Sequence, residues 1–143
     1  MTEILISNNF EGKSTPVNVG VDLSYYINML KEVLLSKGGL GISAPEIGIY
    51  QQIFVMNVGF INNNVQVIIN PVIDFQSDRT EELEESCMSC PDQLKSLKRP
   101  ELIHVRYYNE NWELITCYLS GLKARVFMHE YEHLQGKCIF NEN

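Results

Sequence analysis

Near its C-terminal end the chain carries the sequence His129-Glu130-Tyr131-Glu132-His133, which has the pattern HExxH. Side chains four residues apart lie one above the other on an α-helix, so the two imidazoles can reach one divalent cation. Glu130 then points towards the open side of that cation. The pattern therefore requires a helix here and predicts metal-assisted hydrolysis. The competing interpretation is a surface helix that carries two solvated histidines.

A catalytic metal held by two histidines needs a third protein ligand and one open position. Downstream of His133, only Cys138 and Glu142 could bind a metal, and Gly136 is placed to end the helix before them. The alternative lies upstream, where the segment 84–91 offers a cysteine and ends at a proline. A thiolate with two imidazoles suits zinc or ferrous iron and excludes magnesium and calcium.

Three motifs follow one another along the chain: GLGISAPEIG at 39–48, ESCMS at 85–89 and HEYEHLQG at 129–136. In order and spacing they resemble the motifs GΦGΦAAPQΦG, EGCLS and HExxHLxG of the peptide deformylases, the metallohydrolases that remove the formyl group from nascent polypeptides. The resemblance covers roughly residues 39–136. It implies a single α+β domain over residues 1–143, with small antiparallel or mixed sheets packed around a C-terminal metal-binding helix.

The resemblance implies a role for the second and third motifs. Cys87, His129 and His133 are the expected metal ligands. Ferrous iron is the expected ion, with zinc, nickel or cobalt as substitutes. Glu130 is the expected general base and then general acid, because it can accept a proton from metal-activated water and deliver it to the leaving amine.

Two further sets of residues are expected around the reacting bond. The backbone N–H of Met88 and the side chain of Glu46 would face the charge that develops on the formyl oxygen. The glycines of the first motif would let the backbone come close to an extended substrate. Apolar positions before the first histidine of the last helix could be core or the wall of a methionine pocket. The expected substrate-binding residues are Gly39, Leu40, Gly41, Leu122 and Val126.

Glu46 is the serious departure from the family pattern, which has glutamine here; Ser43, Ser86 and Met88 are modest ones. A glutamine amide can donate a hydrogen bond to the formyl oxygen, whereas an ionised carboxylate has no proton to donate and repels an oxyanion. We therefore expect an active deformylase in which Glu46 is neutral when substrate is bound. The alternatives are a deformylase-like metal-binding protein with weak or no turnover, and a different metallopeptidase completed by a downstream ligand.

Charge and composition exclude several other functions. A net charge of −7 and a pI near 4.9 argue against direct nucleic-acid binding. The first twenty residues lack a secretion signal, and no apolar segment approaches the roughly 20 residues that span a bilayer. We expect a cytoplasmic monomer that acts on formylmethionyl peptides, with the ribosome as a candidate partner. The chain ends soon after Gly136, like short bacteriophage forms, for which the host bacterial cytoplasm would be the compartment.

Periodicity predicts two helices and several strands. Asp22 is a good N-cap for a helix that ends at Gly38-Gly39, and its apolar stripe is expected to be core. The final helix should run from after Ser120 to Gln135, with Gly136 following it. Strands are expected at 52–58, 65–69 and 79–84, with a turn at 59–64 and a hairpin formed by 102–108 and 112–119. The first twenty residues resemble the family poorly, and no role is predicted for them.

Overall fold

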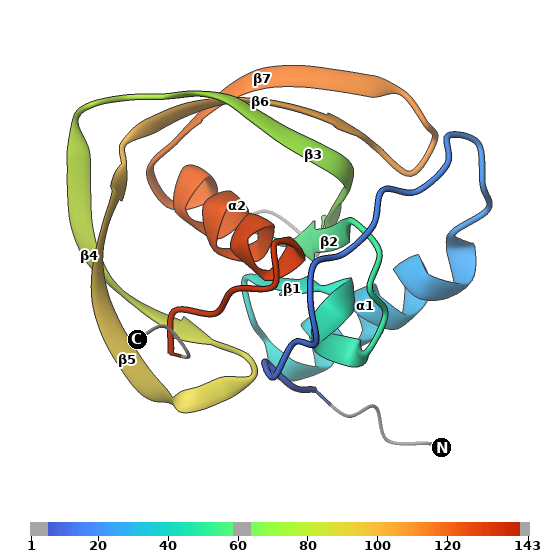
Figure 1. Ribbon diagram of the computed structural model, residues 1–143, viewed down its shortest axis with the longest axis horizontal. Coiled ribbons are helices and arrows are strands. Elements are labelled where there is room, and N and C mark those ends of the chain that lie inside the picture. Colours follow the sequence, from blue (N-terminus) through green and yellow to red (C-terminus); the bar gives the residue numbers. More distant parts are fainter. Residues whose placement is uncertain (1–5, 59–63, 141–143) are drawn as a thin grey trace.

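The computed structural model describes residues 6–58 and 64–140. These residues form the expected α+β arrangement, with two α-helices, a five-stranded sheet and a two-stranded sheet (Figure 1). The helices are α1 (Ser24–Lys37) and α2 (Gly121–Leu134), and a short 3-10 helix, η1 (Ala44–Ile47), follows the first strand. The larger sheet is antiparallel in the order β1-β2-β3-β6-β7, with β1 (Gly41–Ser43), β2 (Ile53–Met56), β3 (Gln66–Gln76), β6 (Leu102–Tyr108) and β7 (Leu114–Ser120). The smaller sheet pairs β4 (Thr80–Cys87) with β5 (Cys90–Pro100).

Strand β2 lies between the two helices, and all of its residues are buried. Ile53 and Val55 pack in the core cluster that includes α1, whereas Phe54 and Met56 pack in the cluster that includes α2. A strand covered on both faces has an unbroken apolar sequence rather than an alternating one. Helix α2 therefore sits in the middle of the molecule, with the long strands curving around it (Figure 1).

The β4–β5 hairpin contains a strand that the sequence does not indicate. The segment 90–100 is rich in polar residues and has a proline near each end, so no strand is predicted there. It becomes a strand because it pairs with β4, and the register places Glu81 opposite Arg99 and Glu82 opposite Lys98. Across the hairpin, the guanidinium of Arg99 on β5 forms an ion pair with the carboxylate of Glu85 on β4. Long-range pairing thus overrides a weak local preference.

Strand β3 continues past residue 69, where the sequence predicts its end. Asn70 has a positive φ of 53°, and the register with β6 shifts between Ile69 and Val72. The side-chain amide of Asn70 accepts from the backbone N–H of Val17 and donates to its carbonyl oxygen, both at 2.8 Å. The irregularity bends the strand and binds the N-terminal segment instead of ending the strand.

The other predicted elements agree with the structure to within a few residues. Helix α1 begins at Ser24 with Leu23, rather than the predicted Asp22, at the N-cap position, although the backbone N–H and hydroxyl of Ser24 donate to the carboxylate of Asp22. Helix α2 is followed by Gly136, whose φ of 81° is left-handed as expected. The predicted turn at 59–64 lies almost entirely outside the described residues. Within the described ranges, no helix is long and apolar enough to cross a membrane.

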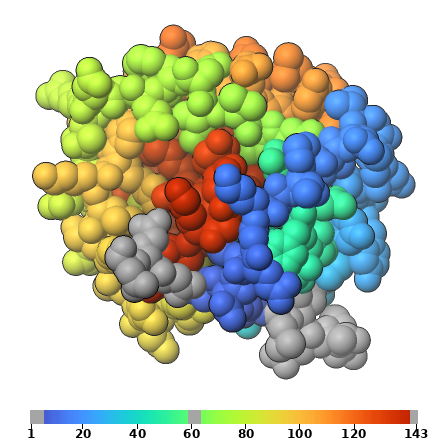
Figure 2. Space-filling model, in the orientation of Figure 1, coloured from blue at the N-terminus to red at the C-terminus, as the bar shows by residue number. Residues whose placement is uncertain are grey.

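The N-terminal segment, for which the sequence predicts no role, packs against the C-terminal end of α2. Figure 2 shows these two parts of the chain side by side on one face of the molecule. The backbone N–H of Ser14 donates to the carbonyl oxygen of Leu134 at 2.8 Å. The centroids of the Phe10 and His133 rings are 5.2 Å apart. The segment therefore covers one of the two histidines of the HExxH motif.

Candidate active site

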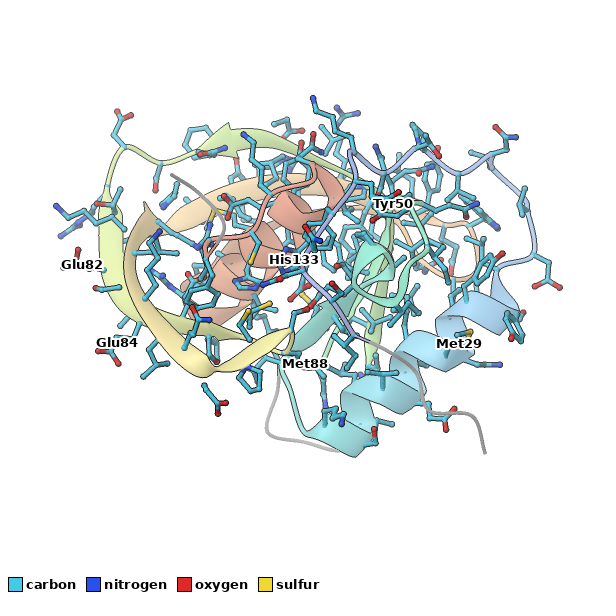
Figure 3. All side chains as sticks on the ribbon, turned by 60° about the horizontal axis from the view of Figure 1, so that its bottom comes forward. Met29, Tyr50, Glu82, Glu84, Met88 and His133 are labelled. Atoms are coloured by element: carbon cyan, nitrogen blue, oxygen red, sulfur yellow. The ribbon has the colours of Figure 1, made fainter. Side chains whose placement is uncertain are left out.

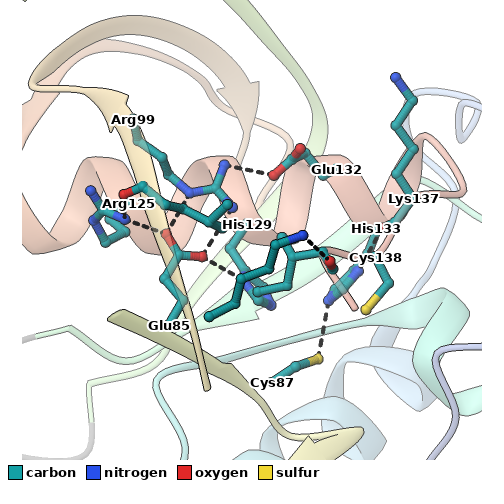
Figure 4. Close-up of polar contacts among 12 residues, drawn as sticks. Glu85, Cys87, Arg99, Arg125, His129, Glu132, His133, Lys137 and Cys138 are labelled. Carbon is teal, nitrogen blue, oxygen red and sulfur yellow. Dashed lines mark hydrogen bonds and ion pairs between the residues drawn. The ribbon is translucent and has the colours of Figure 1, made fainter. Parts of the chain in front are cut away.

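The structure brings together the three residues that the resemblance implies as metal ligands. His129 and His133 lie one turn apart on α2, and Cys87 is the last residue of β4. All three are buried, and their candidate ligand atoms lie within 4.8 Å of one another. The sulfur of Cys87 is 3.4 Å from Nε2 of His133 (Figure 4). One thiol and two imidazoles, a donor set that fits zinc or iron, thus face a common point.

Each imidazole is oriented through its Nδ1 atom. Nδ1 of His129 lies 3.0 Å from the carboxylate of Glu85, and Nδ1 of His133 lies 3.0 Å from the carbonyl oxygen of Lys137. Because a carbonyl and an ionised carboxylate can only accept, each Nδ1 atom is the hydrogen-bond donor. Metal-binding histidines are commonly held in this way, which leaves Nε2 as the donor atom for a metal.

Glu85 is a buried carboxylate that joins the hairpin to α2. It accepts hydrogen bonds from Arg99 on β5 and from Arg125 and His129 on α2 (Figure 4). Burial raises the pKa of Glu85, but His129 and Arg99 together outweigh burial and lower the pKa to about 2. Sequence reasoning did not assign roles to Glu85, Arg99 or Arg125. The available signal was that Glu85 opens the second motif.

Glu130 lies beside the candidate ligands and is buried, with 4% of its surface exposed. Among the residues that the structure describes, its Oε1 atom has no hydrogen-bond partner. Burial, and then the negative charge of Glu46, raise the pKa of Glu130 well above the ordinary value for a glutamate. A buried carboxyl group with a free oxygen and a raised pKa is suited to proton transfer.

Glu46 is held as an acceptor in this structure, and the expectation that it is neutral when substrate is bound stays a prediction. Its oxygens accept hydrogen bonds from the backbone N–H and hydroxyl of Ser43 and from the hydroxyl of Ser89. Burial raises the pKa of Glu46, but the charge of His133 and these donors lower it on balance. These contacts favour the ionised form. Glu46 is also absent from the residues that line the neighbouring cavity in the described part of the chain.

The thiol of Cys87 lies among acidic groups. A hydrogen bond with Cys138, then burial, then the charges of Glu46 and Glu130 raise the pKa of the Cys87 thiol. A coordinated cation has the opposite effect, since a thiol that binds a metal is deprotonated. Cys138, one of the two downstream candidates, lies next to Cys87 but outside the group of three converging ligand atoms. The other candidate, Glu142, lies outside the described residues.

A cavity of about 300 Å³ opens beside the candidate ligands. Its walls come from the glycine-rich segment 38–41, from residues 84–88 of the hairpin and from one face of α2. In Figure 3, Met88 lies at the hairpin turn near His133, whereas Glu82 points away into solvent. The cavity wall includes Met88 and all the residues expected to bind substrate, which are Gly39, Leu40, Gly41, Leu122 and Val126.

Two glycines in this wall, Gly39 and Gly41, are required by protein packing as well as by any substrate. A Cβ atom on Gly41 would lie 2.9 Å from a carboxylate oxygen of Glu130 and 3.0 Å from a methyl carbon of Val126. A Cβ atom on Gly39 would lie 2.5 Å from the sulfur of Met88. These glycines were expected to allow close approach of the substrate. They also provide the space that the side chains of Glu130 and Met88 occupy.

Comparison with known proteins gives consistent matches. The family described as Polypeptide deformylase matches residues 5–143. A peptide deformylase of Thermotoga neapolitana is 39% identical over 115 residues, which cover 80% of this chain and 68% of that protein. The crystal structure of peptide deformylase from Thermotoga maritima has a TM-score of 0.88 at 32% identity and covers 99% of this chain and 98% of that one. A structure of a peptide deformylase from Synechococcus elongatus in complex with actinonin has a TM-score of 0.85 at 26% identity, over 100% and 82% of the two chains. These matches give no support to the alternative of a binding protein without turnover.

Gly41→Ala should impair the site without unfolding the protein. The added methyl group would press on the carboxylate of Glu130, and a displacement of about 1 Å near a reacting group can lower the rate about 100-fold. Gly12→Ala is the matched control, because no atom lies within 4 Å of a Cβ atom built at Gly12. The measurement is activity towards a formylmethionyl peptide. Equal activity of the two variants would show that the contact with Glu130 is unimportant.

Stability should fall in acid because of Glu85, whose folded-state pKa is about 2 against an ordinary value of 4.5. A lowered carboxyl pKa contributes stability above the unfolded-state value, and this contribution is lost as pH falls towards the folded-state pKa. The free energy of unfolding of wild type, measured in urea, should therefore fall by up to about 3 kcal/mol between pH 5 and pH 2. Glu85→Gln should not show this fall. Parallel pH profiles would contradict this assignment.

Proposed function

Because this chain belongs to the polypeptide deformylase family, we propose that Cys87, His129 and His133 hold its divalent metal and that Glu130 moves the proton of the reaction. The protein is a hydrolase that removes the N-formyl group from the N-terminal formylmethionine of polypeptides and releases formate. The observation that carries the site assignment is the convergence of three buried ligand atoms within 4.8 Å of one another.

The proton steps fall to Glu130. The chemistry that a divalent cation supplies when bound is Lewis acidity, which polarises an amide carbonyl and acidifies water. Glu130 accepts the proton of the attacking water and later delivers it to the nitrogen of the leaving amine. Its buried oxygen, which has no hydrogen-bond partner among the described residues, and its raised pKa support this role, because such a carboxyl group readily accepts a proton.

The cavity beside these groups is the proposed site of the formylmethionyl end of the substrate. Val126 is largely buried and Leu122 is 45% exposed, so together they offer an inner and an outer apolar surface for a methionine side chain. Gly39, Leu40 and Gly41 also line the cavity, and Gly41 is the first residue of the edge strand β1. The turn residue Met88 is the proposed source of the backbone N–H that faces the formyl oxygen.

The role proposed for Glu46 differs from that of a donor. Its carboxylate accepts hydrogen bonds from Ser43 and Ser89, so it holds its neighbours in place rather than donating to the formyl oxygen. Stabilisation of the oxyanion then depends on the metal site and on Met88. Glu46→Gln should keep or raise activity, because an amide adds a donor without adding charge.

The finer predictions concern the metal and the setting of the protein. The family is metal-dependent, and we propose ferrous iron, with zinc, nickel or cobalt as substitutes, because a thiolate with two imidazoles suits these ions. We also propose that the protein is a monomer. It would act in the cytoplasm, or in the host bacterial cytoplasm if phage-encoded, on formylated chains at the ribosome.

Glu130→Gln should abolish formate release while leaving the metal bound. The amide cannot exchange a proton with water, and loss of a general acid–base group costs about 100- to 10,000-fold in kcat. The assay is formate release from a formylmethionyl peptide by protein loaded with ferrous iron or nickel, together with metal content. Glu82→Gln is the matched control, because Glu82 is exposed and points into solvent (Figure 3). A Glu130→Gln variant within tenfold of wild type would contradict the proposed role.

A further inference from the structure

The carboxylate of Glu46 accepts hydrogen bonds from Ser43 on one oxygen and from Ser89 on the other. Its Oε1 atom accepts from the backbone N–H of Ser43 at 3.0 Å and from the Ser43 hydroxyl at 2.9 Å. Its Oε2 atom accepts from the hydroxyl of Ser89 at 2.6 Å. Ser43 and Glu46 are 0% and 1% exposed, so bulk water cannot take the place of these donors. One serine thus fixes one oxygen of the carboxylate and thereby the direction of the other.

The same carboxylate lies against two of the proposed metal ligands. Its Oε2 atom is 3.6 Å from the sulfur of Cys87, and its Oε1 atom is 3.7 Å from Nε2 of His133. Ser89 lies in the turn that directly follows Cys87, the last residue of β4. Its hydrogen bond to Glu46 therefore fixes the turn next to the Cys87 sulfur. A rotation of the Glu46 carboxylate would move a buried charge and release this turn.

We propose that Ser43 is a positioning residue for deformylation that acts through Glu46. Its hydroxyl and N–H hold one carboxylate oxygen, direct the other towards Ser89 and keep the charge at a fixed distance from Cys87. This inference rests on the proposed function of the site. It adds to that site a residue that is absent from the cavity wall in the described ranges.

The Ser43 hydroxyl matters because residue 46 is a carboxylate. Ser43→Ala removes one of the two Ser43 donors that hold Oε1 of this buried carboxylate, and a buried carboxylate depends on its donors more than a neutral amide does. In a Glu46→Gln variant the amide oxygen can still accept from the backbone N–H of residue 43. Loss of the hydroxyl should therefore harm the wild-type site and spare the Glu46→Gln site.

The test is a cycle of wild type, Ser43→Ala, Glu46→Gln and the double variant, each loaded with nickel. Ser43→Ala should lower kcat/KM for formate release about tenfold, mainly through kcat, with unchanged metal content. The same substitution in the Glu46→Gln background should cost less than about twofold. Ser36→Ala is the matched control, because it removes a hydroxyl that donates only to a carbonyl within α1, and it should leave activity unchanged.

The midpoint of urea unfolding gives a second readout that does not depend on turnover. Ser43→Ala should lower the midpoint in the wild-type background and change it little in the Glu46→Gln background. Equal losses of kcat/KM in the two backgrounds would overturn the proposal. It would also be overturned if Ser43→Ala shifted the unfolding midpoint differently in the two backgrounds but lowered kcat equally in both. If wild type released no formate, the proposed function would fail. Unequal midpoint shifts would then still support the Ser43–Glu46 coupling, and equal shifts would overturn it.

Discussion

The buried carboxylate of Glu85 joins the β4–β5 hairpin to helix α2, and the geometry of the site depends on this connection. Its partners Arg99, Arg125 and His129 come from both elements. A two-stranded ribbon is marginally stable alone, so a fixed place for Cys87, two residues further on, requires such an anchor. Burying several charges costs free energy, and the network is best understood as selecting one arrangement of hairpin and helix rather than as maximising stability.

The centre of the site brings together acidic groups that raise one another's pKa values. Glu46 and Glu130 are both buried, their charges raise the pKa of the Cys87 thiol, and the charge of Glu46 also raises the pKa of Glu130. A divalent ion has the opposite effect on these pKa values, because it favours the thiolate and ionised carboxylates around it. Metal binding and proton transfer are therefore coupled, because both depend on the same few acidic groups. Within that space, the Glu46 carboxylate is kept at a fixed place by its hydrogen bonds.

The convergence of the two histidines could be predicted from the sequence because their spacing is local, whereas Cys87 was expected there from the resemblance. The histidines of HExxH share a helix face by the geometry of the helix, and the motif around Cys87 supplies the sulfur. The supporting contacts could not be predicted in the same way, since Arg99 and Phe10 reach the site only through tertiary packing. Likewise the helices and the β6–β7 hairpin follow from local patterns, whereas β5 exists through its pairing with β4. The charge state of Glu46 depends on donors whose positions no periodicity specifies.

The central claim is that one sulfur, that of Cys87, and two imidazoles bind one ion. The most direct measurement is the absorption spectrum of the cobalt-substituted protein, in which a bound thiolate gives a sulfur-to-cobalt charge-transfer band in the near ultraviolet. Cys87→Ser should lose this band, whereas Cys138→Ser should keep it, because Cys138 lies outside the group of converging ligand atoms in the described part of the chain. Retention of the band in Cys87→Ser, or its loss in Cys138→Ser alone, would contradict the account.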